Sequence, residues 1–256
     1  MTPEAHAHLS QVDPVFRRLI ESVGLCPLKP DRRRSPFEAL VRAVAHQQLN
    51  GTAAETILGR FLALFPAGRF PEPDEVLAVP DEAIRAAGFS RAKLAAIRDI
   101  ATKAAAGIVP HRRDLAKLPD EEIGVRLTEC RGVGRWTVEM FLMFTLGRQD
   151  VLPVDDFGVR NGFRLAYGLA EMPSAKELMA AGESWRPHRT TASWYLWRAV
   201  DLAKEAAQKA KPEKVRKSAP KEPLAKKTGV KKTPPKKPAP LKRAKAGSKR
   251  PGGASK

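Results

Sequence analysis

The chain has only two cysteines among its 256 residues, and this scarcity excludes several classes of protein. Cys26 and Cys130 lie far apart in the sequence and in no metal-ligand pattern. The five histidines show no zinc spacing either. Secreted domains held by disulfides and cysteine-based metal sites are therefore not expected, and we predict a reduced intracellular protein without a metal site.

Long apolar runs are also missing from the sequence. No stretch approaches the ~18 apolar residues that a membrane-spanning helix needs. The N-terminus, MTPEAHAHLSQVD, lacks the basic and then apolar pattern of a signal peptide. We therefore expect no contact with a membrane and a cytoplasmic location.

Strand-like alternation of apolar and polar residues does not persist anywhere, whereas helical periodicity is widespread. Ser35, Asp120 and Ser174 are placed to cap helices, and Gly88, Gly107 and Gly147 to end them. The pattern predicts an all-α fold. The expected helices are Pro14–Ser22, Pro36–Gln48, Thr52–Phe65, Asp74–Leu77, Asp81–Ala87, Arg91–Ala106, Asp120–Cys130, Gly134–Leu146, Asp156–Ala166, Ser174–Gly182 and His188–Ala207.

Two of these helices meet at a short glycine-containing turn, Gly132-Val133-Gly134. Glycines at these positions let the backbone turn tightly and come close to a ligand. The amides of the turn and of the second helix's N-terminus then suit an anion such as a DNA phosphate. Taken alone the signal is weak, because many helical hairpins without a ligand contain two glycines.

The turn is followed by Arg135-Trp136-Thr137, and Asp156 stands 19 residues after Thr137 in Leu152-Pro153-Val154-Asp155-Asp156-Phe157. With this spacing the chain resembles the helix-hairpin-helix DNA glycosylase superfamily, specifically the 3-methyladenine DNA glycosylase II type. The resemblance runs from about Asp13 to Leu202. It implies two helical lobes, with the hairpin (120–146) and Asp156 at the cleft between them. The chain looks like a compact form without the N-terminal β-containing domain of larger members, and it lacks the clustered cysteines of iron–sulfur members.

The resemblance implies a catalytic carboxylate in the Asp155-Asp156 pair. In the family it is the second acid, directly before an apolar or aromatic residue, which here assigns catalysis to Asp156 and makes Asp155 a helix cap or a local hydrogen-bond partner. Counting from Arg160 against the Val-Asp-Thr-His signature of the lyase branch favours Asp155 instead. A third reading is that both residues only cap a helix.

The residue after Arg135 indicates the reaction type. Lyase-competent relatives carry a lysine there, which forms a Schiff base with the sugar. Here it is Trp136, so water is the expected nucleophile. By resemblance Trp136, Trp197 and Phe157 line the base pocket, whereas Trp194, Tyr195 and Tyr167 are assigned to the core. An aromatic face attracts a cationic alkylated purine by ~0.5–2 kcal/mol.

Two further segments are expected to contact DNA. The hairpin residues Gly132, Val133, Gly134, Arg135 and Thr137 would bind the backbone of the strand. Because the target base must be flipped out of the duplex, a residue has to fill the gap in the stack. We assign this plug to Gln48 or Leu49 at the end of an apolar helix, although an ordinary helix C-terminus fits the same residues.

Together these features predict a monofunctional glycosylase that excises alkylated purines, 3-methyladenine and 7-methylguanine among them, from double-stranded DNA and so starts base excision repair. The alternatives are a non-catalytic DNA-binding protein and a glycosylase for deaminated or oxidised bases. We expect a monomer on the nucleoid and no redox cofactor. A monovalent cation at the hairpin carbonyls is a weaker expectation.

The net charge of +18 is concentrated at the C-terminal end: Lys204 and the residues after it carry +16, and the rest of the chain carries +2. We divide the chain into a glycosylase body (1–207) and a Lys/Pro/Ala-rich tail (208–256). The tail has almost no apolar side chains and is expected to be disordered. It would tether the protein to DNA or, alternatively, only increase solubility.

Overall fold

The computed structural model describes residues 2–49, 51–66 and 68–209. All the regular structure in these ranges is helical and none of it is strand, as the periodicity predicts. Among the described helices, none is both long and apolar enough to cross a lipid bilayer. Residues 210–256 of the predicted tail lie outside the described residues, so the expected disorder stays a prediction.

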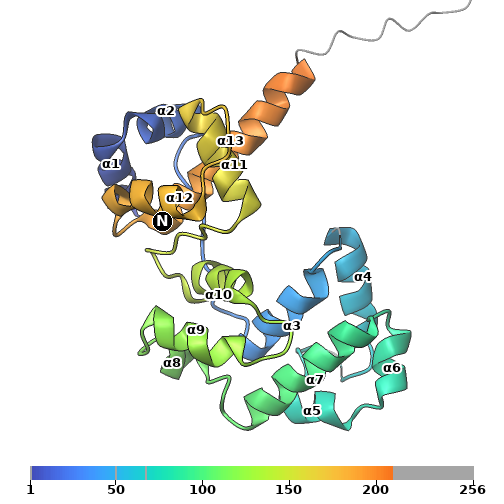
Figure 1. The fold of residues 1–256 in the computed structure, drawn as a ribbon. Coiled ribbons are helices and arrows are strands. Elements are labelled where there is room, and N and C mark those ends of the chain that lie inside the picture. The colour runs from blue at the N-terminus through green and yellow to red at the C-terminus, as the bar shows by residue number, and fades with distance from the viewer. Residues whose placement is uncertain (1, 50, 67, 210–256) are drawn as a thin grey trace, which may run out of the picture. The chain divides into compact units, whose positions relative to one another are not determined.

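One hydrophobic core is built by a continuous stretch of the chain, the group of helices from α3 to α10 in Figure 1. Leu40, Ile97 and Ile123 lie at its centre and are fully buried. The helices of this lobe are α3 (Pro36–His46), α4 (Gly51–Leu62), α5 (Pro73–Ala78), α6 (Asp81–Ala86), α7 (Arg91–Ala105), α8 (Arg112–Leu115), α9 (Asp120–Thr128), α10 (Arg135–Phe141) and the π-helix η1 (Leu142–Leu146).

A second core is built by the N-terminal helices together with the C-terminal ones. Trp185, Tyr195 and Phe16 are its largest fully buried side chains. Trp197 packs against both cores. The helices of this second lobe are α1 (Pro3–Val12), α2 (Pro14–Val23), α11 (Phe157–Tyr167), α12 (Ala175–Ala181), the 3₁₀-helix η2 (Gly182–Trp185) and α13 (Arg189–Lys209).

The helix ends follow local chemistry, with one exception to the predicted caps. Ser35 accepts a hydrogen bond from the Glu38 amide at the start of α3, and Ser174 forms a capping box with Glu177 at the start of α12. Asp120 was expected to cap α9, but it is the first residue of that helix and pairs with Arg148, with an Nε–Oδ1 distance of 2.8 Å.

Helices α11 and α13 approach each other closely because glycine stands at their contact. A Cβ atom on Gly162 would lie 1.9 Å from the main-chain oxygen of Leu196, a distance that no side chain tolerates. Gly158, four residues earlier and on the same side of α11, faces Trp197. This close packing holds the start of α11, where Asp156 lies, against the middle of α13.

Candidate active site

Asp156 is the N-cap of α11, and its carboxylate accepts three hydrogen bonds. Oδ1 accepts from the Val159 amide at 2.7 Å and from the Trp197 indole Nε1 at 2.8 Å. Oδ2 accepts from the Trp136 indole Nε1 at 2.7 Å. An ionised carboxylate is an acceptor only, so these three donors suit it and fix its orientation.

Asp155 has a different environment from that of its neighbour. Its side chain is exposed and makes no hydrogen bond within the described residues. The prediction that Asp155 caps the helix is therefore wrong, because Asp156 itself occupies the cap position. One carboxylate can cap a helix and also accept hydrogen bonds from other side chains, since it has two oxygens and several lone pairs.

The two tryptophans that bind Asp156 come from different lobes. Trp136 lies on α10 and is 46% exposed, whereas Trp197 lies on α13 and is partly buried. Gly158 makes room for the second of these contacts, since a Cβ atom there would lie 2.8 Å from Trp197 Cδ1 and 3.0 Å from Asp156 Oδ1. The carboxylate therefore joins α10, α11 and α13 at one point.

A cavity of about 530 Å³ opens beside Trp136. Its walls are formed by the end of α3 and the exposed side of α10, and it is mostly apolar. A smaller cavity of about 210 Å³ shares His46, Thr137 and Met140 with it and reaches Phe144. The residues around the larger cavity are Ala43, His46, Gln47, Gln48, Trp136, Thr137 and Met140.

Three aromatic residues differ from the predicted pocket. Phe157 is 71% exposed, and neither Phe157 nor Trp197 lines either cavity, so their predicted places in the base pocket have no support from the cavity walls. Phe144 was not predicted, yet its ring stacks on Trp197 with centroids 6.0 Å apart and an interplanar angle of 25°. Phe144 lies in the π-helix that continues α10, and it covers one side of the Trp197 ring.

The hairpin glycines serve different purposes. Gly132 has a φ of +79°, and a Cβ atom on it would lie 3.1 Å from the Cβ of Ala96, so the fold itself requires glycine there. Gly134 has an ordinary φ of −95°, and a Cβ atom on it would meet nothing within 4 Å. Among the described residues, the amides of Gly134, Arg135 and Trp136 have no hydrogen-bond acceptor, as at other helix starts.

The other predicted hairpin residues divide into buried and exposed ones. Val133 and Thr137 are 4% and 3% exposed, so their side chains anchor the hairpin and do not face solvent. The Arg135 side chain is exposed and donates from Nε to Glu139 Oε1 at 2.9 Å.

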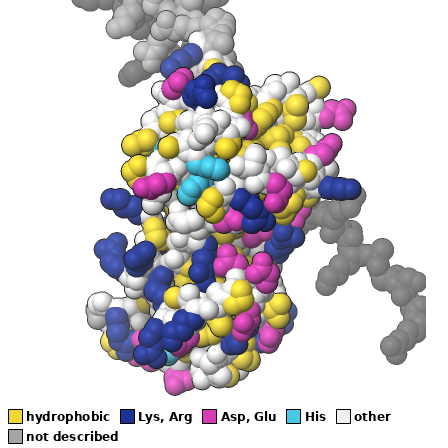
Figure 2. Space-filling view, turned by 90° about the vertical axis from the view of Figure 1, so that its left-hand side faces the viewer, with side chains coloured by type: hydrophobic (Ala, Val, Ile, Leu, Met, Phe, Trp, Pro, Cys, Tyr) yellow, Lys and Arg dark blue, Asp and Glu magenta, His cyan; other side chains and the backbone are white. Residues whose placement is uncertain are grey.

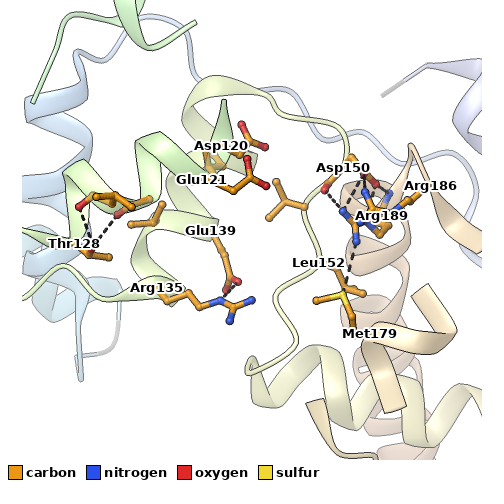
Figure 3. Close-up of a pocket in the computed structure, with 15 residues that line it drawn as sticks. Asp120, Glu121, Thr128, Arg135, Glu139, Asp150, Leu152, Met179, Arg186 and Arg189 are labelled. Carbon is orange, nitrogen blue, oxygen red and sulfur yellow. Dashed lines mark hydrogen bonds and ion pairs between the residues drawn. The ribbon is translucent and has the colours of Figure 1, made fainter. Parts of the chain in front are cut away.

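This pair lines a further cavity of about 540 Å³ between α9–α10 and the start of α13, opposite Asp150, Arg186 and Arg189 (Figure 3). Burial raises the pKa of Glu139 above its usual value, against the opposing effect of Arg135. Its second carboxylate oxygen is buried without a hydrogen-bond partner in the described residues.

The predicted plug lies in the turn after α3. Gln48 and Leu49 are exposed, Leu49 to 40%, and Gln48 has a φ of +56°, which is uncommon for a residue other than glycine. Gln47, just before them, donates from Nε2 to the main-chain oxygen of Gly132 at 2.9 Å. The turn after α3 is thus bonded directly to the hairpin.

Metal-binding clusters are absent from the described residues, where no group of three or more His, Cys, Asp or Glu side chains is placed to hold an ion. Cys26 and Cys130 are free and buried. Burial raises the pKa of the Cys130 thiol to about 11, so this cysteine is a poor nucleophile near neutral pH.

The surface of the folded part carries charges of both signs. Figure 2 shows one face on which Lys and Arg side chains are interspersed with Asp and Glu side chains. This mixture agrees with the small net charge that the sequence assigns to the residues before Lys204. The described part of the chain therefore depends on local groups, such as the hairpin amides, rather than on a strong overall field to attract an anion.

Three residues that shape the site were not predicted as site residues. Gly158 and Gly162 form a G-x-x-x-G pattern on α11, which is a sequence signal for close helix packing that could have been used. Phe144 follows Trp136 and Met140 at intervals of four residues, but a helical repeat of apolar residues does not separate a cavity wall from the core.

Comparison with known proteins identifies the family of this chain. Residues 41–187 match the model of the HhH-GPD superfamily of base excision DNA repair proteins. The DNA-3-methyladenine glycosylase 1 of Schizosaccharomyces pombe is 40% identical over 201 residues, which are 78% of this chain and 88% of that protein.

Two solved structures are similar to this fold. One is a 3-methyladenine DNA glycosylase of Schizosaccharomyces pombe in complex with abasic DNA, with a TM-score of 0.70 and 40% identity, covering 78% of this chain and 98% of that one. The other is a DNA-3-methyladenine glycosidase from Bacillus halodurans, with a TM-score of 0.69 and 36% identity, covering 80% and 92%. The chain therefore belongs to the HhH-GPD superfamily of base excision DNA repair proteins.

Proposed function

We propose that this protein is a DNA-3-methyladenine glycosylase, a hydrolase that cleaves the N-glycosidic bond of alkylated purines in DNA. The observation that carries the proposal is the Asp156 carboxylate held by Trp136 and Trp197, with Trp136 also forming a wall of an open apolar cavity. Its relatives from Schizosaccharomyces pombe and Bacillus halodurans, which it covers almost completely, are named for the same activity.

The DNA strand binds at the hairpin. The free amides of Gly134, Arg135 and Trp136 are donors for a backbone phosphate, and the open space beside Gly134 lets the phosphate approach. The solved Schizosaccharomyces pombe relative is in complex with abasic DNA, which supports DNA binding by this chain. Gln48 and Leu49, bonded to the hairpin through Gln47, are the proposed plug that fills the gap left by the flipped nucleotide.

The flipped base enters the cavity beside Trp136. Alkylation at N3 or N7 gives a purine a positive charge, and the electron-rich face of an indole attracts a cation by ~0.5–2 kcal/mol. The cavity walls are mostly apolar, which favours a flat ring over a hydrated ion. A cationic base leaves as a neutral molecule, so the reaction needs no strong general acid.

In the reaction the bond between the sugar C1′ and the base nitrogen breaks, and its electron pair stays with the base. Asp156 stabilises the positive charge that develops on the sugar, as carboxylates do in glycosidases. Water then bonds to C1′ and loses a proton to the carboxylate or to solvent. Trp136 offers no amine for a Schiff base, so the proposed product is an intact strand with an abasic site.

We also propose roles for the C-terminal part of the chain. We place the boundary between the glycosylase body and the basic tail at residues 207 and 208, and assign to the tail a tether to DNA. The protein would act as a monomer at the nucleoid. For a monovalent cation at the hairpin, the Glu129 and Gly132 carbonyls are already taken by Lys103 and Gln47, which reduces the oxygens on offer.

The test is the release of free bases from DNA treated with a methylating agent. We expect the purified full chain to release 3-methyladenine and 7-methylguanine, which chromatography separates and identifies. DNA that carries deaminated bases serves as the parallel substrate. Release from the deaminated DNA alone would favour the alternative glycosylase, and binding without any release would favour a non-catalytic DNA-binding protein.

A further inference from the structure

The turn after α3 that carries Gln48 and Leu49, here called the plug turn, has a conformation that needs support from outside the turn. Gln48 is left-handed at φ +56°, which costs an ordinary residue on the order of 1 kcal/mol. Both Gln48 and Leu49 are exposed, so packing of their own side chains does not hold them in place. Within the turn itself, the Leu49 amide bonds only weakly to the His46 oxygen, at 3.3 Å.

Besides the bond from Gln47 to the Gly132 oxygen, the support comes from a lysine on α7. Lys93 Nζ donates to the main-chain oxygens of Ala45 and Gln47, each at 2.7 Å. These two carbonyls belong to the last turn of α3 and its cap, where a helix has unsatisfied oxygens and favours a cation. Lys93 is partly buried, and this burial lowers its pKa. The Lys93 ammonium therefore holds the end of α3 and the start of the following turn together.

The same helix also holds the hairpin. Asp99 Oδ2 accepts from the Arg131 amide at 2.7 Å, and Lys103 Nζ donates to the Glu129 oxygen at 2.5 Å. Ala96 packs so close to Gly132 that a Cβ atom on Gly132 would lie 3.1 Å from the Ala96 Cβ. Residues 93, 96, 99 and 103 are three or four apart and therefore share one face of α7.

We propose that Lys93 is a positioning residue that fixes Gln48 and Leu49 at a set distance from the hairpin, so that the plug enters the duplex while the hairpin grips the phosphate. The inference rests on the proposed function. Lys93 touches neither the base nor the sugar, and it acts through the turn. Its loss leaves Asp156 and the α10 side of the base cavity in place. It makes Gln48 and Leu49 mobile, so flipping from a paired duplex becomes harder.

The experiment compares Lys93→Met with the control Arg91→Met. Arg91 is exposed on the same end of α7 and makes no hydrogen bond or ion pair within the described residues, so its loss removes the same charge without touching the turn. Lys93→Arg keeps a charge and donors for both carbonyls. The substrate is 7-methylguanine, either paired in a duplex or unpaired in a single-nucleotide bulge. Release is measured under single-turnover conditions.

Because flipping a paired nucleotide costs a few kcal/mol, we expect Lys93→Met to slow release from the duplex by about tenfold or more and release from the bulge by about threefold or less. Arg91→Met should change both rates equally and little, and Lys93→Arg should restore much of the duplex rate. Equal loss on both substrates, or no loss on either, would overturn the assignment.

A second measurement does not depend on catalysis. A duplex with a stable abasic analogue and a neighbouring 2-aminopurine reports insertion of the plug by fluorescence. We expect the wild-type protein and Arg91→Met to change the signal at saturation and Lys93→Met to change it less. If the wild-type protein releases neither 7-methylguanine from these substrates nor 3-methyladenine from methylated DNA, the proposed function fails, while the fluorescence result still decides the role of Lys93. Should Lys93→Met not fold, Lys93→Gln, which keeps a neutral amide donor on a shorter side chain, is expected to give an intermediate duplex defect.

Discussion

At the scale of single residues, the carboxylate of Asp156 is fixed by groups from three segments: the first turn of α11, the indole of Trp136 on α10 and the indole of Trp197 on α13. These three donors therefore hold both oxygens of the carboxylate in place. A preorganised charge needs no reorientation when positive charge develops on the sugar.

The first prediction separates the two adjacent acids. Asp156→Asn should lower single-turnover base release by about 10²-fold or more, because the amide is neutral and offers the indoles one acceptor oxygen in place of two. Asparagine is a good N-cap, so α11 should persist. DNA affinity should be equal or higher, since a negative charge is removed. Asp155→Asn is the matched control and should lose far less. The opposite ranking of the two variants would assign catalysis to Asp155.

The second prediction concerns the reaction product. Because Trp136 has no amine, sodium borohydride should trap no covalent adduct between the protein and abasic DNA. The product strand should stay intact until it is treated with alkali, which a denaturing gel shows. If an adduct does form, the same trial with a chain that ends at Gln208 tells whether one of the tail lysines supplied the amine.

The sequence singled out Asp156, Trp136 and Trp197 because each carries a distinctive chemical group. The structure brings their side chains together, and their catalytic and pocket roles stay predictions. That both indoles donate to the Asp156 carboxylate could not be predicted, since residue spacing does not show which side chain an indole N–H faces. Phe144 and Gly158 went unnoticed for the same reason, because their importance comes from a neighbour that lies far away in the sequence.

At the scale of elements, the third prediction concerns the two hairpin glycines. Gly132 is required by the fold, whereas Gly134 is proposed to leave room for a phosphate. Gly132→Ala should destabilise the fold by about 1–2 kcal/mol or more, since alanine at positive φ is strained and Ala96 lies close. Gly134→Ala should cost less than about 1 kcal/mol, because alanine is only a poorer cap. It should nevertheless weaken DNA binding by about tenfold, or about 1.4 kcal/mol, by crowding the phosphate.

Urea unfolding and fluorescence anisotropy with labelled duplex measure the two effects. A loss of stability without loss of affinity in Gly134→Ala would mean that no phosphate comes close to this glycine.

Helices were predictable to within a few residues where caps and glycine stops frame them, as at Ser35, Ser174 and Gly107. Helix α1 was missed because its apolar face is short, with only Ala5, His6 and Leu9 buried. The predicted helix Gly134–Leu146 continues as a π-helix from Leu142, and periodicity does not distinguish that winding from an α-helix over one turn. The Lys93 bonds to α3 are likewise absent from any local pattern.

At the scale of the whole molecule, the charge is divided unequally, and this gives the fourth prediction. The residues from Lys204 onward carry +16 against +2 for the rest. Each phosphate contact contributes about −0.9 to the slope of log affinity against log salt on duplex DNA. A chain that ends at Gln208 should therefore bind DNA more weakly at low salt and with a shallower slope. Single-turnover release at saturating enzyme should barely change, since the whole described site precedes this end.

Titration of DNA binding at several salt concentrations checks the slope for both chains. Loss of the single-turnover rate on truncation would show that residues after Gln208 belong to the active site and that the proposed boundary is misplaced.

The way the chain divides between its two cores also has a consequence for its synthesis. The core of α3 to α10 is continuous in sequence, so it can close as soon as residues up to about 151 have left the ribosome. The core that contains Phe16 also needs Trp185 and Tyr195. Helices α1 and α2 are made first, yet they must wait for α13, with their apolar faces uncovered during most of translation. Contacts that join the two ends of a chain form slowly. The N-terminal helices are thus where a nascent chain of this enzyme is most exposed to chaperones and to aggregation.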